Sequence, residues 1–404
     1  GGSMQLTLTG ALKGELKRDV LRRMMLVGLI AFFTLIDLFA AQALAPQLTE
    51  AYGTDTASMG LALNMAAVGM AVAGLTVAWF SDRIDRRLGI WVSLVVLAVP
   101  TALLAVVDDL VLFTLLRVIQ GACMATAFTL TMTFLSEECD LTAAAGAMAA
   151  YVSGNVASNL FGRLMASEVA AGIGVFDTFY VFAALNLLGA LLAILVIGVR
   201  STQPPARSGP PLEAWRRHMA NPPLRAAFGL GFLILFVFVG VFTYVNFELV
   251  GPTYGLAPAD LGLVYLVFLP SLITTPMAGD LVARFGPQRL FMGAAALSLA
   301  AIAATLPGNL MATLLGLAVL AAATFQMQAA ATAFVGRVAE GNRAAANGLY
   351  LTAYYLGGLM GALVVGLVYE AGGWTGAALV IALALAGAAA LARQLSVPGS
   401  ATAA

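Results

Sequence analysis

Two charged residues, Asp37 and Arg117, stand inside long apolar runs of the sequence. A charge near the centre of a lipid bilayer costs about 2.5–3.5 kcal/mol on insertion scales, so such a residue usually faces a cavity or a partner. An arginine keeps its proton there and needs an anion, whereas a carboxyl group can bind and release a proton. The pattern therefore predicts an Asp37–Arg117 ion pair whose carboxylate titrates. A static pair that only fixes helix packing is the alternative.

Other polar side chains in apolar runs are further candidates. Glu248 lies near the end of its run and could couple protons, although a plain position at the membrane interface explains it equally well. Uncharged polar groups either hydrogen-bond between helices or contact a substrate. Arg163 lies close to the end of its run, and we expect it to reach the interface and to serve packing. We expect a substrate cavity to be lined by Gln42, Gln120, Tyr244, Asn246, Gln326 and Tyr354.

The elements that position these residues follow from composition. The chain has 404 residues, of which 61% are hydrophobic and only 10% charged, whereas a soluble domain is about 25% charged. Apolar stretches of about 20 residues recur, and each can cross a hydrocarbon core of about 30 Å as a helix. The strands of a membrane barrel would alternate polar and apolar residues, which these stretches do not. We therefore predict an all-α protein embedded in the lipid bilayer.

Hydropathy predicts twelve transmembrane helices in two sets of six. The first set lies near 24–46, 57–80, 88–107, 110–135, 143–168 and 175–199, and the second near 224–250, 258–282, 288–307, 311–336, 344–369 and 375–393. The predicted domains are a cytoplasmic N-terminus with a cloning remnant at 1–23, bundles at 24–199 and 224–393, a cytoplasmic linker at 200–223 and a tail at 394–404. We expect an amphipathic helix near 212–218 in the linker and a solvated His218.

Basic residues indicate which side of the membrane is cytoplasmic. Every Lys and Arg except Arg117 and Arg163 falls at the termini, in the linker or in turns on one side of the predicted membrane. Short loops rich in Lys and Arg stay in the cytoplasm. We therefore place both termini there, in a bacterial cytoplasmic (inner) membrane. A net charge of zero, with basic residues confined to membrane-edge turns, argues against nucleic acid binding.

The sequence offers little for catalysis or cofactor binding. It lacks a phosphate-binding glycine loop followed by Lys and Ser or Thr, which disfavours an ATP-driven machine. Cys123 and Cys139 form no disulfide framework or metal-ligand spacing with the single histidine. We therefore expect no enzyme activity, metal or cofactor. A basic turn at 81–87 recurs in weaker form at 283–289, which suggests a duplicated membrane protein and hence a transporter.

Several segments resemble those of a known family. Residues 78–87 are similar to the basic signature Gly-x-x-x-Asp-Arg-x-Gly-Arg-Arg/Lys of the major facilitator superfamily, with Ala78 and Asp85 in place of glycines. Residues 117–121 resemble Arg-x-x-Gln-Gly, a signature associated with proton coupling in its drug:proton antiporter branch. Residues 134–138, 153–164 and 349–357 resemble segments of YnfM-type bacterial inner-membrane transporters.

The resemblance implies a fold and a mode of action. The fold would be two pseudo-symmetric six-helix bundles around a central cavity that opens alternately to each side. Asp82 would lie at the start of the eleventh helix, and Arg86 would pair with Glu137 or Glu138. The implied inner gate comprises Asp82, Arg86, Arg87, Glu137 and Glu138.

The expected function is proton-coupled efflux of a small organic or amphiphilic compound by a monomer. Its partners would be the small-molecule substrate, protons and the lipid bilayer. An uptake symporter for a metabolite is one alternative. A non-transporting receptor or assembly factor on the same scaffold is the other.

Overall fold

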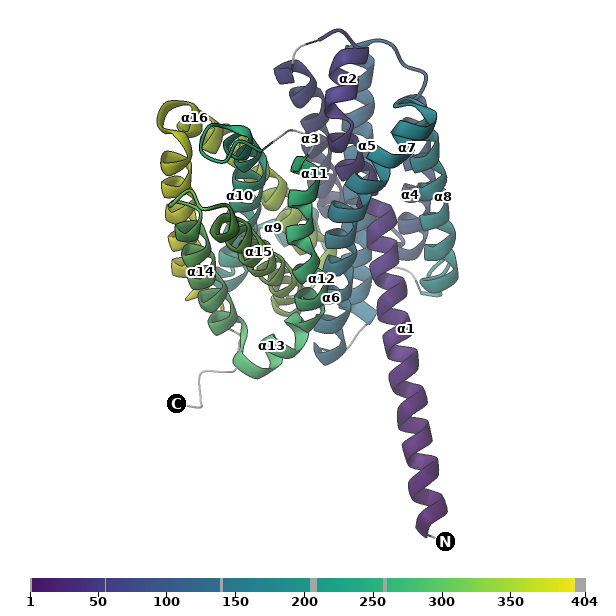
Figure 1. Ribbon diagram of the computed structural model, residues 1–404. Coiled ribbons are helices and arrows are strands. Elements are labelled where there is room, and N and C mark those ends of the chain that lie inside the picture. The colour runs from purple at the N-terminus through teal and green to yellow at the C-terminus, as the bar shows by residue number, and fades with distance from the viewer. Residues whose placement is uncertain (1, 55, 139–140, 204–208, 257–259, 397–404) are drawn as a thin grey trace.

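The computed structural model describes the chain except for residues 1, 55, 139–140, 204–208, 257–259 and 397–404. All regular elements of the described residues are helices (Figure 1). The first half contains α1 (Gly2–Ala43), α2 (Ala45–Ala51), α3 (Thr56–Phe80), η1 (Ser81–Arg83), α4 (Arg86–Leu103), α5 (Leu110–Glu138), α6 (Leu141–Ala157), η2 (Ser158–Gly162), α7 (Arg163–Ile173) and α8 (Thr178–Val196). The linker contains α9 (Pro211–Ala220). The second half contains α10 (Pro222–Val250), α11 (Leu261–Val264), η4 (Tyr265–Phe268), α12 (Leu269–Thr274), η5 (Thr275–Met277), α13 (Ala278–Phe285), α14 (Pro287–Ala304), α15 (Leu310–Val338) and α16 (Arg343–Ala392).

These helices account for twelve membrane crossings. Ten of the described helices are long and apolar enough to span a bilayer. One of them, α16, is two crossings in succession, because Gly373 interrupts it with a φ of 64°. The segment α6–η2–α7 provides the remaining crossing, which a π-helical turn divides. The predicted all-α fold with twelve transmembrane helices is therefore confirmed.

One crossing is not a continuous helix. Where hydropathy predicts a span at 258–282, the structure has α11, η4, α12, η5 and α13 in succession. Pro270 and Pro276 lie in the first turns of α12 and η5. Proline lacks a backbone N–H and clashes with the preceding turn, so it interrupts an α-helix. The segmented crossing packs against α6 and α15, where neighbouring helices cover its irregular backbone.

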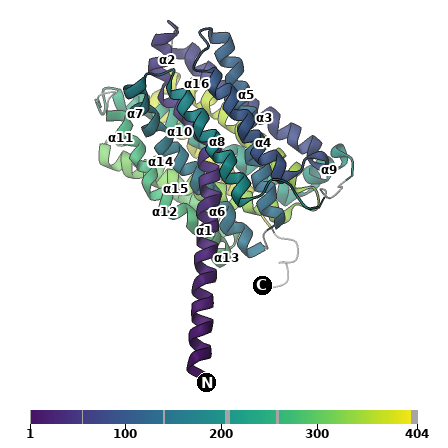
Figure 2. The ribbon, with the colours of Figure 1, turned by 90° about the vertical axis from the view of Figure 1, so that its right-hand side faces the viewer.

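The helices form two bundles that lie side by side, one of α1–α8 and one of α10–α16 (Figure 1). α1 is much longer than a bilayer is thick and extends beyond its bundle towards the N-terminus (Figure 2). The face at which α1 enters the bundle and α16 ends is termed the terminal face below, and the opposite face is termed the far face. α3 and α10 run between these two faces in opposite directions.

The two bundles touch closely on the side of the terminal face. Gly74 of α3 and Gly348 of α16 lie so near each other that a Cβ atom on either glycine would meet the carbonyl oxygen of the other. Thr352 Oγ1 also donates a hydrogen bond of 3.0 Å to the carbonyl of Ala71. Small residues allow two membrane helices to approach in this way. The interior of the protein is therefore closed at the terminal face.

A Gly348→Val substitution should loosen this contact, because backbone atoms of α3 leave no room for the added side chain. Overpacking of this kind costs about 1–3 kcal/mol, so the thermal unfolding midpoint of the purified protein should fall. Gly172→Val is the matched control, because Gly172 is also helical and has open space around its Cβ position. Equal unfolding midpoints for the two variants would contradict the close α3–α16 contact.

Candidate functional site

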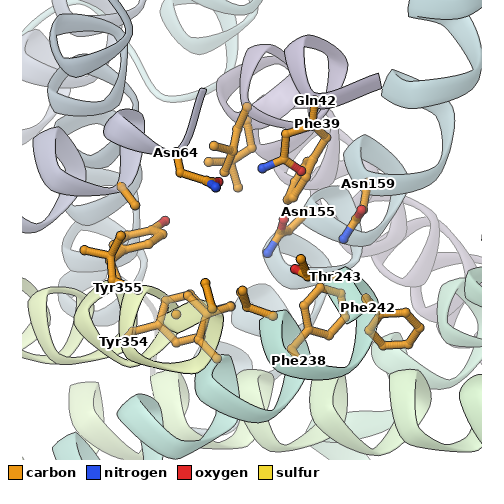
Figure 3. A pocket seen from close by; sticks show the side chains of 18 of the residues that line it. Phe39, Gln42, Asn64, Asn155, Asn159, Phe238, Phe242, Thr243, Tyr354 and Tyr355 are labelled. Atoms are coloured by element: carbon orange, nitrogen blue, oxygen red, sulfur yellow. The ribbon is translucent and has the colours of Figure 1, made fainter. Parts of the chain in front are cut away.

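A cavity of about 390 Å³ lies between the two bundles. Its wall combines aromatic rings with side-chain amides, as Figure 3 shows. The rings are those of Phe39, Phe238, Phe242, Phe247, Tyr265, Phe325, Tyr354 and Tyr355, and the amides are those of Gln42, Asn64, Asn155, Asn159 and Gln328. Such a mixture of apolar surface and a few oriented polar groups is typical of a small-molecule site.

The cavity opens towards the far face. Asn64 lines it from the half of α3 nearer the far face, and Thr243 and Phe247 line it from the corresponding half of α10. All three residues are exposed. On the other side of the cavity, the α3–α16 contact around Gly74 and Gly348 closes the path to the terminal face. The cavity is therefore accessible from the far face only.

Asp37 and Arg117 belong to one buried hydrogen-bond network in the first bundle. The exposed fraction is 3% for Asp37 and 0% for Arg117. Thr101 Oγ1 lies 3.0 Å from Asp37 Oδ2, and Gln120 Nε2 donates to Thr101 Oγ1 at 2.9 Å. Arg117 Nη1 donates to Gln120 Oε1 at 2.8 Å. Thr101 and Gln120 thus connect the carboxyl group to the guanidinium.

The direct ion pair that we predicted between these two residues is not formed. Within the residues that the structure describes, no carboxylate lies within ion-pair distance of Arg117. The guanidinium instead donates to the Leu63 carbonyl, through Nε at 3.3 Å and Nη2 at 3.2 Å, and to the main-chain carbonyl of Asp37 at 3.3 Å. The dipoles of these carbonyl groups satisfy the buried cation, so the carboxylate does not need to touch it.

This network lies against the cavity wall. Leu63 lines the cavity, and its carbonyl accepts two of the hydrogen bonds from Arg117. Leu38, the residue after Asp37, lines the cavity as well. Asp37 itself does not contribute to the lining, and its Oδ1 atom is buried with no hydrogen-bond partner in the described part of the chain. A change in the network can therefore reach the cavity through α1 and α3.

The predicted substrate contacts divide into two groups. Gln42 and Tyr354 line the cavity, as expected. The other described residues of that prediction, Gln120, Tyr244 and Gln326, lie outside the lining. The reason in each case is a competing hydrogen bond. Asn246 lies outside the residues whose side chains are described.

Each of these three side chains hydrogen-bonds to a residue of a neighbouring helix instead of lining the cavity. Gln120 bridges Arg117 and Thr101. The Tyr244 hydroxyl donates to the Ala362 carbonyl, and Gln326 Nε2 donates to the Thr274 carbonyl. Polar groups in membrane helices often bond between helices in this way.

Glu248 lies near the far face and away from the cavity lining. Its Oε2 atom accepts a hydrogen bond of 3.0 Å from the Tyr369 hydroxyl. Tyr369 stacks on Tyr244 with ring centroids 5.8 Å apart. The carboxylate therefore joins α10 to α16 near the far face. Its role in proton coupling stays a prediction.

Arg163 lies in the cavity wall, although the sequence suggested that it reaches the membrane interface. Its Nη2 atom donates to Gln42 Oε1 at 3.1 Å. Its guanidinium carbon lies 4.5 Å from the ring centroid of Tyr265 and 5.8 Å from that of Phe39. Such distances allow cation–π attraction. Arg163 is thus a cavity residue that we assigned wrongly.

The basic turn at 81–87 binds the end of α5. Arg86 Nη2 forms an ion pair of 3.1 Å with Glu137 Oε1, and Arg86 Nη1 donates to the Ile84 carbonyl at 2.9 Å. Arg87 lies over the Phe134 ring, 5.2 Å from its centroid. Glu138 is exposed. Of the two possible partners of Arg86, the structure therefore selects Glu137.

Asp85, which replaces a glycine of the signature, begins α4. Its side chain accepts hydrogen bonds from the backbone N–H groups of Arg87 at 3.1 Å and Leu88 at 3.4 Å, and from Ser201 N at 2.9 Å and Oγ at 2.7 Å. Burial acts to raise the pKa of this carboxyl group, but these hydrogen bonds outweigh it and hold the pKa below its usual range. Asp85 therefore caps a helix and anchors the start of the linker.

The same turn reaches the second bundle at the start of α16. Ser81, next to Asp82, donates a hydrogen bond of 2.7 Å to Asn342 Oδ1. Asn342 caps α16 by accepting a hydrogen bond of 3.1 Å from the Ala345 N–H, and its φ of 34° lies in the left-handed region. Arg343 Nη1 donates to the Ser136 carbonyl at 3.0 Å. The turn and the end of α5 thus meet the start of the eleventh crossing.

The linker helix α9 covers this junction. His218 Nε2 lies 3.1 Å from the Asn342 carbonyl, and His218 is only 1% exposed. The predicted helix in the linker is present, but the predicted solvated histidine is wrong, because α9 packs onto both bundles instead of lying in solvent. Trp215 adds an edge-to-face contact of 5.4 Å with Trp79 of α3. The junction made by Ser81, His218 and Asn342 is termed the latch below.

Sequence patterns gave few signals for the residues that we missed. Thr101 looks like an ordinary hydroxyl in an apolar helix. Asn155 and Asn159 carried no charge to mark them. The turn before α16, with Gly341 and Asn342, has the composition of a helix cap, which was a usable signal. The partners across the latch are distant in sequence, so only the fold reveals them.

Comparisons with known proteins agree with this architecture. The sequence profile of the Major Facilitator Superfamily matches residues 27–268 and 246–403. The chain is 26% identical to the inner membrane transport protein YnfM of Escherichia coli, over 86% of this chain and 84% of that protein. It is 25% identical to the MFS-type transporter YybF of Bacillus subtilis, over 91% and 92% of the two chains. These matches confirm the predicted resemblance to YnfM, and these relatives are transporters and not enzymes.

Two solved structures share the fold. The transporter FucP, crystallised in an outward conformation, aligns with a TM-score of 0.73 at 18% identity, over 93% of this chain and 98% of FucP. The human organic anion transporter MFSD10 aligns with a TM-score of 0.70 at 17% identity, over 93% and 98% of the two chains. At such identities these likenesses show the fold alone.

An Asn342→Gly variant should weaken the latch. Glycine tolerates the left-handed backbone at this position, so the variant removes the side chain without adding strain. The loss of the bonds from Ser81 and Ala345 should speed hydrogen–deuterium exchange in α9 and at the start of α16. Asn342→Asp keeps an acceptor oxygen and is the control. Unchanged exchange in the glycine variant would show that this contact does not hold the face closed.

The latch should also weaken in acid. Burial lowers the pKa of His218 from its usual 6.5, its hydrogen bond to Asn342 opposes this, and the positive charge of Arg217 adds to the lowering. The released imidazole therefore binds a proton more readily than the docked one. Docking is fully stable above pH 6.5 and loses stability as the pH falls from there towards the lowered pKa.

Tryptophan fluorescence can follow this release, because Trp215 of α9 packs on Trp79. We expect a change in emission between pH 7.5 and pH 5.5 that is much reduced in His218→Gln, which cannot titrate. Identical pH profiles for the two proteins would rule out control of the latch by His218.

Proposed function

Since this chain belongs to the Major Facilitator Superfamily, we propose that it is a secondary active transporter that exchanges protons for a small organic compound and exports that compound. The cavity between the bundles would bind the compound, and the bundles would rock to expose it to one face and then the other. We propose that the terminal face is cytoplasmic, in a bacterial inner membrane, because the basic residues gather there and YnfM is an inner membrane protein.

The observation that carries the proton coupling is the hydrogen bonding around Thr101. Its hydroxyl oxygen lies within hydrogen-bond distance of both Asp37 Oδ2 and the Leu97 carbonyl, at 3.0 and 2.8 Å, and also accepts from Gln120. A hydroxyl has one proton and two lone pairs. With Asp37 ionised, Thr101 donates to the carboxylate. With Asp37 protonated, the acid donates to Thr101, which donates to Leu97. Both protonation states therefore fit without moving a heavy atom.

Arg117 makes the two states unequal in energy. Its charge is permanent and buried in the first bundle. When Asp37 is ionised, the network is neutral overall. When Asp37 takes up a proton, one uncompensated positive charge remains in a poorly polarisable environment, which is costly. A conformational change that brings water or substrate nearer would relieve this cost, and this is how we propose that protonation drives the cycle.

α3 would transmit the change to the gate. Its Leu63 carbonyl binds Arg117, and further along the same helix Gly74 packs on α16 and leads into the turn at 81–87. A small rotation of α3 would disturb the proton site and the closed terminal face together. In this proposal Asp82, Arg86, Arg87, Glu137 and Glu138 act as the inner gate when the cavity faces outward. The latch, which joins the two bundles next to the Arg86–Glu137 ion pair, supports that role.

The direction of transport is a separate part of the proposal. A proton-coupled uptake symporter could use the same network with substrate moving inward. Counterflow measured under inward and outward proton gradients separates the two, because an exporter is accelerated by protons on the side that receives the substrate. A receptor or assembly factor would give no substrate-dependent flux under either gradient.

The decisive test of proton coupling is Asp37→Asn in proteoliposomes. Asparagine keeps the size of the side chain and can still accept from Thr101, but it cannot bind a proton. A substrate would first be selected by a thermal-shift screen of the purified protein against antibiotics, dyes, siderophores and small metabolites. We expect transport driven by a pH gradient to fall to the rate of protein-free liposomes, while substrate exchange without a gradient continues.

Asp177→Asn is the matched control, because Asp177 is exposed in a loop at the far face. Undiminished gradient-driven transport by Asp37→Asn would refute the assignment of Asp37 as the coupling residue.

A further inference from the structure

We propose that the transported compound is an organic anion with an aromatic or otherwise apolar body, and that Arg163 binds its acidic group. This inference rests on the proposed transport function and specifies the substrate of the same cavity. It follows from three properties of the cavity wall: its charge, the alignment of its polar groups and the separation of its polar and aromatic sides.

The charge of the wall is positive. Of the described residues that line the cavity, Arg163 carries the one ionised side chain, and none of the others is Asp or Glu. A cationic substrate would meet a like charge and no lining carboxylate. An anion would meet a guanidinium, whose planar N–H groups match a carboxylate, sulfonate or phosphate. The cavity therefore favours anions over cations.

Local backbone geometry places Arg163 in this wall. It is the first residue of α7 and follows the π-helical turn η2 at 158–162. Four residues overshoot one turn of an α-helix by about 40°, because it has 3.6 residues per turn, and the wider π turn offsets this overshoot. Asn155, Asn159 and Arg163 are spaced by four and all line the cavity. The π turn at this position therefore places Asn155, Asn159 and Arg163 in one line along the cavity wall.

The two asparagines on this line are prepared to bind a ligand. Asn155 is 7% exposed and Asn159 1% exposed. Both Oδ1 atoms are buried with no hydrogen-bond partner in the described part of the chain. The protein thus leaves these two amide oxygens without the hydrogen bonds that buried polar groups normally make. In Figure 3 both side chains border the cavity, next to Gln42. These oxygens can accept hydrogen bonds from hydroxyl or N–H groups of a bound molecule and so orient it.

Gln42 is oriented by Arg163 itself. Its Oε1 atom accepts the hydrogen bond from Arg163 Nη2, so its amide nitrogen remains as a donor. Arg163, with this donor beside it, forms a cluster suited to oxygen atoms that carry negative charge. The guanidinium carbon of Arg163 lies over the rings of Tyr265 and Phe39, so cation–π attraction helps to hold this charge in the cavity wall.

The opposite part of the wall is aromatic. Phe238 contacts Phe242 and Phe325, with ring centroids 4.8 and 5.3 Å apart. Tyr354 and Tyr355 extend this surface on α16, across the cavity from Gln42 and Asn159 (Figure 3). The first bundle thus supplies the charge and most of the amides, and the second supplies most of the aromatic surface. A molecule with an acidic end and a flat apolar body matches both.

The test compares three probes that differ in charge: 1-naphthoate, 1-naphthalenemethanol and 1-naphthylmethylammonium. Binding to the purified full-length protein in detergent would be measured by calorimetry at pH 7.5. We expect the anion to bind most tightly and the cation most weakly. In Arg163→Gln, the dissociation constant of naphthoate should rise by about tenfold or more, as expected for loss of a charge-assisted hydrogen bond. Affinity for the neutral alcohol should stay the same.

Two further variants make the result specific. Arg163→Lys keeps the charge and should retain part of the affinity for naphthoate. Arg284→Gln removes an exposed arginine at the terminal face and should bind all three probes as the unmodified protein does. Unfolding midpoints would verify that each variant is folded. The proposal is overturned if naphthoate binds Arg163→Gln with unchanged affinity, if the cation binds best, or if none of the probes binds.

Equilibrium binding does not depend on proton coupling. Failure of the Asp37→Asn experiment would therefore refute the proposed antiport and leave the preference for anions standing. A preference for cations would refute the present inference and leave the antiport standing.

Discussion

The structure depends on one constraint, which is that the buried guanidinium of Arg117 cannot lose its charge. A helix in a membrane can hold such a group only if nearby atoms replace its hydration. The carbonyls of Leu63 and Asp37 and the amide of Gln120 do so. These contacts tie α5 to α1 and α3 and bring Thr101 of α4 into the same network. The charge that the bundle must accommodate therefore determines how four of its helices meet.

The closed face is built from contacts of a different kind, between small residues and helix ends. Gly74 and Gly348 bring α3 and α16 together without charge, and Asn342 then serves three partners at once: Ser81, Ala345 and His218. These neutral contacts, and the hydrogen bond from Arg343 to the Ser136 carbonyl, can be broken and remade in the proposed transport cycle, whereas a buried ion pair between the bundles would be costly to separate. The Arg86–Glu137 pair lies within the first bundle, so it can persist while the bundles move apart.

Hydropathy and charge predicted the fold well, because a bilayer forces spanning segments to be long apolar helices and leaves basic residues at the cytoplasmic edge. They also located Asp37, Arg117 and the basic turn, since charges in apolar runs are conspicuous. Predictions of where single side chains lie were wrong at positions that depend on local backbone geometry or on partners distant in the sequence. A π turn carries Arg163 into the cavity, and packing of α9 buries His218. We predicted that Tyr244 and Gln326 contact the ligand, but both donate hydrogen bonds to carbonyl groups of neighbouring helices.

The two halves share a fold but have diverged in chemistry. The first contains Asp37, Arg117 and Arg163, and its basic turn reaches the latch. The corresponding turn at 283–289 has lost most of its charge. Gln288 in this turn donates a hydrogen bond of 3.0 Å to the Arg393 carbonyl, near the end of the second bundle. The second half offers aromatic surface to the cavity instead. A substrate that touches both walls would bridge a charged bundle and a ring-lined one, so its binding would pull together the two parts whose relative motion, in the proposed function, carries it across the membrane.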